Sequence, residues 1–205
     1  TRETFWNPLF FWGTWTGGTL CIYAFGRSGY PGLRRHLLLA AVSVPLWWWF
    51  ELVNARLQNW QYISAFDYNR IEYMLFASLA FSTVVPALDA ASRLTEAGPL
   101  RSRAPATAYG QRGYAMETAV GVVLVALTFA VPDLLFPLTW VGPFVVCDGL
   151  VGYWGGRSLV SDVYQGEWRL AVAVGIAGLL CGFFWEFWNF WSSPKWTYDV
   201  PAFEF

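Results

Sequence analysis

The chain has 205 residues, of which 56% are hydrophobic, 20% aromatic and only 13% charged. Soluble domains carry about 25% charged residues, and the mean hydropathy of this chain is +0.38. The composition excludes disordered, collagenous, coiled-coil and disulfide-rich secreted proteins, and it indicates an integral membrane protein. The net charge of −1 provides no basic field that would attract nucleic acid.

Six apolar stretches reach or approach the ~20 residues that a membrane-spanning helix needs. They cover residues 8–25, 37–53, 71–88, 116–131, 138–156 and 170–191. We therefore expect an all-α, polytopic transmembrane bundle of about six helices in contact with the lipid bilayer. Pro132, Pro137 and Pro143 lie around the junction of the fourth and fifth stretches, and they predict a tight hairpin there with kinked helix ends.

Basic residues in the connecting segments predict the orientation, because cytoplasmic loops of membrane proteins are enriched in Lys and Arg. The first, third and fifth connections hold Arg27, Arg34, Arg35, Arg93, Arg101, Arg103, Arg112, Arg157 and Arg169. The opposite side holds only Arg2, Arg56, Arg70 and Lys195. This asymmetry places the three connections in the cytoplasm and both ends of the chain outside it.

An internal repeat relates the two halves of the chain. Residues 49–54 resemble residues 184–189 at an offset of 135, and Trp60-x-Tyr62 resembles Trp196-x-Tyr198 at an offset of 136. The first two helices thus resemble the fifth and sixth in the same direction, which is a parallel repeat.

The repeat divides the chain into domains. Residues 1–90 are predicted to be a first membrane repeat with three helices, residues 91–115 a cytoplasmic linker, and residues 116–205 a second membrane repeat. In the first half further helices follow the pair, and nothing in the second half corresponds to them. We therefore expect the second repeat to be truncated at its C-terminal end by one or two helices.

Asp148 is the most costly residue to place in a bilayer. It lies about ten residues into the fifth stretch, hence ~15 Å deep at 1.5 Å per residue. A carboxylate at the bilayer centre costs at least ~2.5–3.5 kcal/mol, so Asp148 is expected to face protein or water. Two interpretations stay open: a site for a proton, a cation or a ligand headgroup, or a hydrogen bond between helices.

Two further polar pairs lie in the second and sixth stretches. Asn54 follows Glu51 by three residues, and Asn189 follows Glu186 in the same way. This spacing puts both members of a pair on one helix face. The pairs are interpreted either as a pseudo-symmetric polar pocket between the repeats or as hydrogen-bonding contacts inside each repeat.

Aromatic residues surround both pairs. The predicted aromatic surface consists of Trp48, Trp49, Trp185, Trp188, Trp191 and Trp196. Tryptophan favours the membrane–water interface, so one interpretation is an interfacial belt. The other is an aromatic box with carboxylates at its mouth, suited to a cation such as a quaternary ammonium or to a bound lipid, quinone, carotenoid or chlorin.

Several kinds of site are excluded by the residues available. Cys21, Cys147 and Cys181 form no C-x-x-C pair, and His36 is the only histidine, so this chain is expected to hold no haem and no metal. No catalytic triad, P-loop or G-x-G-x-x-G motif is present. We expect the glycines at 149, 152, 155 and 156 to be positions of close helix packing.

The segment Trp185-Glu186-Phe187-Trp188-Asn189, followed by Pro194-Lys195-Trp196-Thr197-Tyr198, carries a resemblance. It resembles a family of uncharacterised, Trp-rich polytopic bacterial membrane proteins in which W-E-x-W-N runs into P-K-W-x-Y. The resemblance implies a bacterial inner-membrane location. It implies no activity and assigns no catalytic residue.

Two functions fit these observations. The first is a non-catalytic accessory or scaffold subunit of a larger membrane complex, of photosynthetic or respiratory type, or a protein that binds a lipophilic ligand. The alternative is a transporter or membrane enzyme that acts on a lipid-like or cationic substrate through its intramembrane carboxylates. Carboxylates in a water-filled cleft favour the second function, and carboxylates sealed by protein contacts favour the first.

Overall fold

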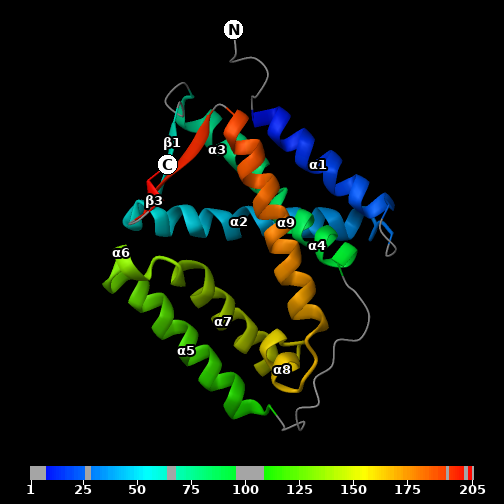
Figure 1. Cartoon of the computed structure of the whole chain (residues 1–205), viewed down its shortest axis with the longest axis vertical. Coiled ribbons are helices and arrows are strands. Elements are labelled where there is room, and N and C mark those ends of the chain that lie inside the picture. Colours follow the sequence, from blue (N-terminus) through cyan, green and yellow to red (C-terminus); the bar gives the residue numbers. More distant parts are fainter. Residues whose placement is uncertain are drawn as a thin grey trace.

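The structure is a computed structural model that describes residues 8–25, 29–63, 68–95, 109–192, 194–200 and 203–204. It is a mostly helical bundle with a small sheet at one end (Figure 1). The elements are α1 (Pro8–Phe25), α2 (Leu33–Leu57), β1 (Trp60–Ile63), α3 (Arg70–Phe81), α4 (Val84–Thr95), α5 (Gln111–Ala130), α6 (Pro132–Leu135), α7 (Leu138–Tyr153), α8 (Leu159–Tyr164), α9 (Arg169–Trp191), β2 (Lys195–Val200) and β3 (Phe203–Glu204).

Each of the six apolar stretches coincides with helix. In the described part of the chain, four segments are long and apolar enough to cross a membrane: α2, α3 with α4, α5 and α9. α7 is a shorter apolar helix, and α1 falls outside these criteria. The helical membrane class therefore agrees with the sequence, whereas the number of six spanning helices stays a prediction.

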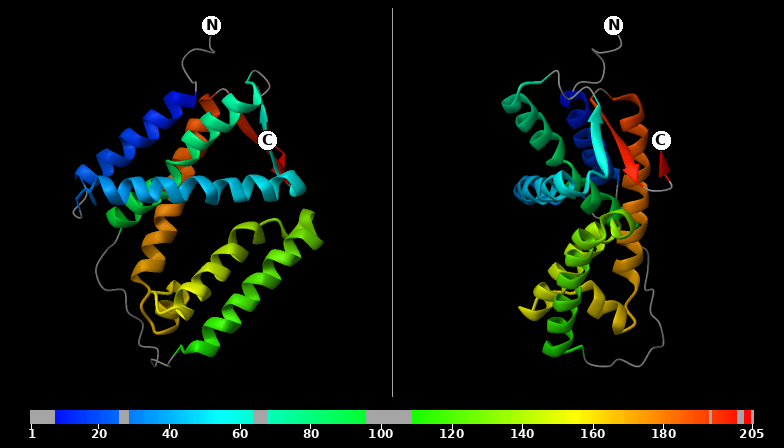
Figure 2. Two further views of the ribbon diagram at one scale, coloured as in Figure 1. Left: turned by 180° about the vertical axis from the view of Figure 1, so that it is seen from behind. Right: turned by 90° about the vertical axis from the view of Figure 1, so that its left-hand side faces the viewer.

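The ends of the helices gather on two opposite sides of the molecule. The sheet, the start of α3 and the end of α9 lie toward the top of Figure 1, and α6 and the end of α2 lie at its left edge. α8 and the starts of α5 and α9 lie toward the bottom, and the end of α4 and the start of α2 lie at the right. We call these two sides the sheet end and the α8 end. Figures 1 and 2 both show α5 and α7 on one side of α2 and α1 and α3 on the other, while α4 and α9 cross α2.

α5 and α7 lie side by side, and glycines set how close they come. A Cβ atom on Gly121 would lie 2.5 Å from the backbone nitrogen of Val146, and one on Gly149 would lie 2.6 Å from Oγ1 of Thr118. Gly152 is enclosed in the same way by the ring of Tyr114. The predicted hairpin and the packing role of the glycines at 149 and 152 are thus confirmed.

The glycines at 155 and 156 have another role. Gly155 has a φ of +82°, and no atom lies within 4 Å of a Cβ built on it. A positive φ suits glycine and allows the chain to turn after α7. A Cβ atom on Gly156 would contact only Val151 of the preceding helix. The expectation of helix packing at these two positions was wrong, because α7 ends at Tyr153 and not at residue 156.

The stretch over residues 71–88 is interrupted by a turn at Ser82 and Thr83, between α3 and α4. The side chain of Ser43, in α2, stabilises this turn. Its hydroxyl donates to the carbonyl of Phe81 and accepts from the backbone nitrogen of Val85 at 3.1 Å. Ser43 is buried, so a polar side chain inside the bundle satisfies two backbone groups that the turn leaves open.

The core lies where α1, α4 and α9 meet. Trp15, Ala87, Ala91, Ala177 and Cys181 form one buried cluster. Small side chains on α4 and α9 allow the two helices to approach closely, as is usual in membrane bundles. The linker predicted over residues 91–115 falls largely on residues 96–108, which lie outside the described residues; residues 91–95 and 111–115 are helical.

The sheet has the order β1-β2-β3, and sequence analysis did not predict it. β1 and β2 are antiparallel, with Trp60 opposite Tyr198 and Tyr62 opposite Trp196. β3 pairs with the end of β2. The all-α class fits most of the chain, and this sheet connects the ends of α2 and α9.

Candidate functional site

Two asparagines connect the ends of α2 and α9 to the strands that follow them. The side chain of Asn54 donates to the carbonyl of Trp60 at 2.8 Å and accepts from its backbone nitrogen at 3.2 Å. The side chain of Asn189 does the same for Trp196, at 2.9 and 3.0 Å. Each amide therefore fixes the backbone of one tryptophan at the start of a strand.

The two glutamates repeat this correspondence. Oε1 of Glu51 accepts from Nε1 of Trp60 at 3.2 Å and from the hydroxyl of Tyr62 at 2.6 Å. Oε1 of Glu186 accepts from Nε1 of Trp196 at 3.4 Å and from the hydroxyl of Tyr198. We call the two sets of contacts the Glu-Asn-Trp-Tyr motifs: Glu51, Asn54, Trp60 and Tyr62 in the first, and Glu186, Asn189, Trp196 and Tyr198 in the second.

The sheet brings the two motifs together. Its register centres on the pair Gln61 and Thr197, so that the tryptophan of each motif lies opposite the tyrosine of the other. Such a register is what a two-fold axis through the sheet would produce. Each Glu-Asn pair thus makes its hydrogen bonds inside its own motif, and the pairing of β1 with β2 joins the motifs.

Both tyrosines of the motifs are held in the neutral, hydrogen-bond-donating form. Burial raises the pKa of Tyr62 well above its ordinary value, and the charge of Glu51 raises it further. Burial is also the main cause of the raised pKa of Tyr198, followed by its hydrogen bond with Glu186. A phenol that stays protonated can donate to a carboxylate over the whole physiological pH range.

A cavity of about 300 Å³ lies beside the sheet. Five tryptophans line it, and we call it the tryptophan pocket: Trp47, Trp60, Trp140, Trp185 and Trp196. They come from five elements, in order α2, β1, α7, α9 and β2. The remaining wall includes Phe11, Tyr62, Tyr73, Phe76, Phe81, Glu186 and Tyr198.

The tryptophan rings contact one another closely. The rings of Trp47 and Trp185 are stacked, with 4.8 Å between their centroids. Those of Trp60 and Trp140 are stacked at 5.9 Å, and the ring of Trp196 meets Trp185 edge to face at 5.8 Å. Aromatic pairs in these geometries stabilise a fold by about 0.5–1.5 kcal/mol each beyond the area they bury. The wall is therefore an ordered aromatic surface.

The aromatic residues singled out in the sequence are divided between several environments. Trp185 and Trp196 line the pocket. Trp48 packs against α3, and its Nε1 donates to Oγ of Ser78 at 2.9 Å. Trp49 and Trp191 are exposed, and Trp188 packs against the core cluster. Trp185 also packs against the core cluster, and a single surface formed by residues 185, 188 and 191 stays a prediction.

Asp148 lies apart from the pocket, five residues before α7 ends at Tyr153. Its carboxylate accepts hydrogen bonds from the hydroxyl of Ser158 at 2.6 Å and from the backbone nitrogens of Leu159 and Val160 at 2.8 and 3.0 Å. These donors form the start of α8, where backbone N–H groups have no partner inside the helix. Asp148 thus has its partners on another element. They are two backbone N–H groups and one side-chain hydroxyl.

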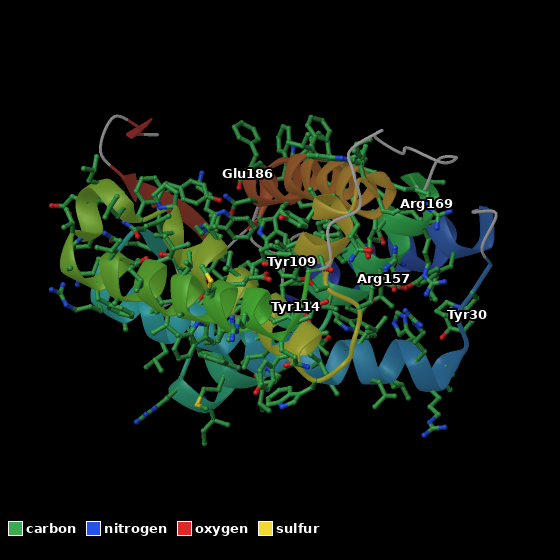
Figure 3. All side chains as sticks on the ribbon, turned by 90° about the horizontal axis from the view of Figure 1, so that it is seen from below. Tyr30, Tyr109, Tyr114, Arg157, Arg169 and Glu186 are labelled. Carbon is green, nitrogen blue, oxygen red and sulfur yellow. The ribbon has the colours of Figure 1, made fainter. Side chains whose placement is uncertain are left out.

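A second carboxyl group near the α8 end was not singled out from the sequence. Glu117 is only 7% exposed, and its Oε2 accepts from the hydroxyl of Tyr109 at 2.9 Å. Burial and this hydrogen bond raise the pKa of Tyr109 to about 12. Figure 3 shows Tyr109 next to Tyr114, and their ring centroids are 5.0 Å apart. Within the described chain, Oε1 of Glu117 has no hydrogen-bond partner.

Asp89 forms an ion-pair cluster that the sequence also did not reveal. Its carboxylate accepts from the hydroxyl of Tyr23 at 2.7 Å, from Arg35 at 3.0 Å and from Arg93 at 2.8 Å. The cluster joins α1, α2 and α4 at the α8 end. Its side chains are mutually satisfied, so its role is to hold three helices together.

Comparison with models of known protein families, with curated proteins and with solved structures found no match, which is consistent with the resemblance to an uncharacterised family and implies no activity. Among the residues that the structure describes, no group of three or more His, Cys, Asp or Glu side chains could hold a metal ion.

Proposed function

We propose that this chain is a non-catalytic membrane protein that holds a lipophilic ligand in the tryptophan pocket. The observation that carries the proposal is the convergence of five tryptophans, from five elements distant in sequence, on one cavity. An interfacial belt requires only that the rings reach the level of the lipid headgroups. In this chain the five tryptophans surround one cavity, and their rings contact one another, which supports a binding site.

The size and chemistry of the pocket favour a flat, largely apolar ligand. Ligand pockets span about 300–1,000 Å³, so this cavity of about 300 Å³ is at the lower end of the range. A single ring system such as that of a quinone matches this volume. A chlorin or a carotenoid is larger than the cavity and would enter it only in part.

The carboxylates favour binding over catalysis. Glu51 accepts hydrogen bonds from two side chains of its own motif, and Asp148 accepts three from the start of α8. A transporter or enzyme that uses these groups would need them free to exchange a proton or a substrate. Asp148, both of whose oxygens accept hydrogen bonds, supports a structural role, which is the first of the two functions.

The membrane placement belongs to the same proposal. The bundle has six spans, with α1 and α7 as the short ones: α1 has 18 residues, about 27 Å at 1.5 Å per residue. The sheet end, and with it the two ends of the chain, faces outward from a bacterial inner membrane, and the α8 end faces the cytoplasm. The distribution of Lys and Arg supports this orientation. The two equivalent Glu-Asn-Trp-Tyr motifs support a parallel repeat.

A role as accessory subunit accompanies ligand binding. Exposed apolar side chains along α9, among them Leu179, Phe183 and Phe190, are 79%, 64% and 69% exposed in the isolated chain. Helices of partner subunits in a larger membrane complex, photosynthetic or respiratory, would cover such side chains as well as lipid does.

Purified protein tests the proposal. Organic extracts of the protein in detergent are examined by absorbance and mass spectrometry, and binding of decylubiquinone is followed by quenching of tryptophan fluorescence. We expect saturable quenching that Trp140→Leu and Trp185→Leu each weaken. Trp154→Leu is the matched control, because Trp154 is 76% exposed after the end of α7 and does not line the pocket. Equal binding by all the variants, with no ligand in the extracts, would refute the proposal.

A further inference from the structure

The charge of the pocket wall is one-sided. Among the described residues that line the tryptophan pocket, Glu186 is the only charged side chain, and none is Lys, Arg or His. Lys195 precedes Trp196 in β2. Because successive side chains of a strand point to opposite faces, Lys195 lies on the face of the sheet opposite to Trp196. The cavity therefore contains a negative charge without a basic side chain beside it.

The carboxylate of Glu186 has capacity for a further partner. The hydroxyl of Tyr198 and Nε1 of Trp196 both donate to Oε1. Oε2 makes no hydrogen bond within the described residues, and the side chain is exposed. Both donors share Oε1, so Oε2 is the oxygen that remains for a ligand.

The aromatic wall complements the same kind of ligand. A cation within about 6 Å of a ring centroid is attracted to the face of tryptophan more strongly than to the face of tyrosine or phenylalanine. An anionic headgroup would face both the negative ring faces and the carboxylate. A neutral ring would use the apolar wall and leave Oε2 unpaired.

We infer that the tryptophan pocket is selective for a cationic amphiphile, a quaternary or protonated amine on a small apolar body, with the amine between Glu186 and the tryptophan rings. This inference rests on the proposed function, since it names the class of ligand that the same pocket takes. It differs from that proposal in requiring a positive charge, whereas a quinone requires only the apolar wall.

Isothermal titration calorimetry in an uncharged detergent tests the inference with three probes of one shape. These are phenyltrimethylammonium, its neutral isostere tert-butylbenzene, and benzenesulfonate. For the unmodified protein we expect the cation to bind most tightly, the neutral isostere about tenfold more weakly, and the sulfonate not measurably. This order of affinities is measured on the unmodified protein, so the test remains valid even if a variant fails to fold.

Glu186→Gln then removes the charge and keeps an oxygen that can accept from Tyr198. We expect it to weaken binding of phenyltrimethylammonium about threefold to fivefold and to leave tert-butylbenzene unchanged. Asp133→Asn is the matched control, because Asp133 is an exposed carboxylate of α6, at the sheet end, that does not line the pocket. Equal affinities for the cation and the neutral isostere, or an unchanged affinity in Glu186→Gln, would overturn the inference.

The two proposals fail in different ways. If decylubiquinone binds and phenyltrimethylammonium does not, the cation preference is wrong and the lipophilic pocket remains. If neither probe binds the unmodified protein, both are wrong.

Discussion

Asn54 and Asn189 show how single side chains can fix the chain that follows the end of a helix. Each uses both polar atoms of its amide on the backbone of one tryptophan. The spacing of glutamate and asparagine was visible in the sequence, because residues three apart share a helix face. The partners of the two asparagines were only partly visible. The repeated W-x-Y pattern was evident in the sequence, but its role in providing the tryptophan backbone for these hydrogen bonds was not.

Substituting Asn54 by Leu is expected to lower the free energy of unfolding by about 2 kcal/mol or more. Two hydrogen bonds are lost, and a buried carbonyl and N–H of Trp60 are left without partners, at about 1–3 kcal/mol each. Unfolding followed by tryptophan fluorescence in detergent measures the change. Gln61→Ala, in an exposed position of β1, is the control. A loss no larger than that of the control would show that the amide does not hold the strand.

Asp148 was found from the sequence because a carboxylate in an apolar stretch is costly. Its environment could not be predicted, since the stretch was expected to continue to residue 156, whereas α7 ends at Tyr153 and α8 folds back toward it. Asp148 thus lies five residues from the end of its helix, within reach of the turn that follows. Nothing in the sequence was a reason to single out Trp140 or Asp89, because one tryptophan in an apolar helix and one aspartate near a helix end form no pattern.

Asp148→Asn is expected to destabilise the fold by about 1–3 kcal/mol. The amide offers one acceptor oxygen where the carboxylate offers two, and its NH₂ group faces the N–H donors at the start of α8. Thermal unfolding of the purified variant measures this effect, with Asp133→Asn as the control. A variant with unchanged stability would favour the interpretation in which Asp148 acts on a ligand or a proton.

At the scale of elements, the lengths of the apolar stretches predicted the helices well, because spanning a bilayer fixes both length and composition. The sheet could not be predicted. β1 has four residues, and its partner β2 begins more than 130 residues later in the chain, so no local alternation announces the pair. α8 was hidden for a similar reason, since a helix of six residues in a polar connection has too few turns to show periodicity.

The α5–α7 contact provides a prediction for two glycines. Gly121→Ala is expected to destabilise the protein by about 2 kcal/mol or more, because its Cβ would lie 2.5 Å from the backbone nitrogen of Val146 and the two helices must move apart. Gly178→Ala is the control, since nothing lies within 4 Å of a Cβ at that position of α9. Alanine is the better helix former by about 1 kcal/mol, so the control is expected to be neutral or slightly stabilising. The free energies of unfolding of the two variants test this prediction, and an equal effect of both substitutions would contradict it.

At the scale of the whole molecule, the sheet joins two motifs with equivalent hydrogen bonds, which the sequence had predicted to be related by a repeat. The correspondence of Glu51 with Glu186 and of Trp60 with Trp196 was proposed from spacing alone, and each pair makes equivalent hydrogen bonds. Superposition of the first two helices on the fifth and sixth, and the domain boundaries, stay predictions. The tryptophan pocket follows from the arrangement of the motifs, because it needs side chains from both halves of the chain.

The orientation is open to labelling with a membrane-impermeant maleimide in intact cells, in a background with Ala at the three cysteines. We expect a cysteine at position 61 in β1 to react from outside and one at position 154, after α7, to react only after the cells are opened. Positions 65 and 107, the natural choices from the sequence, lie outside the described residues. The reverse pattern of labelling would invert the topology, and labelling of both positions from outside would contradict the spanning helices.

The pairing of β1 with β2 has a consequence for how the chain matures during synthesis. Ile63 pairs with Lys195, so 132 further residues, up to and including Lys195, must be added before the strands can meet. Ribosomes add about 5–20 residues per second, so β1 waits on the order of 10 s with an unpaired edge. The first half of the pocket is therefore made early and closed last. During that interval the tryptophans of the first half are open to an assembly factor or to an incoming ligand, before the final strand completes the wall.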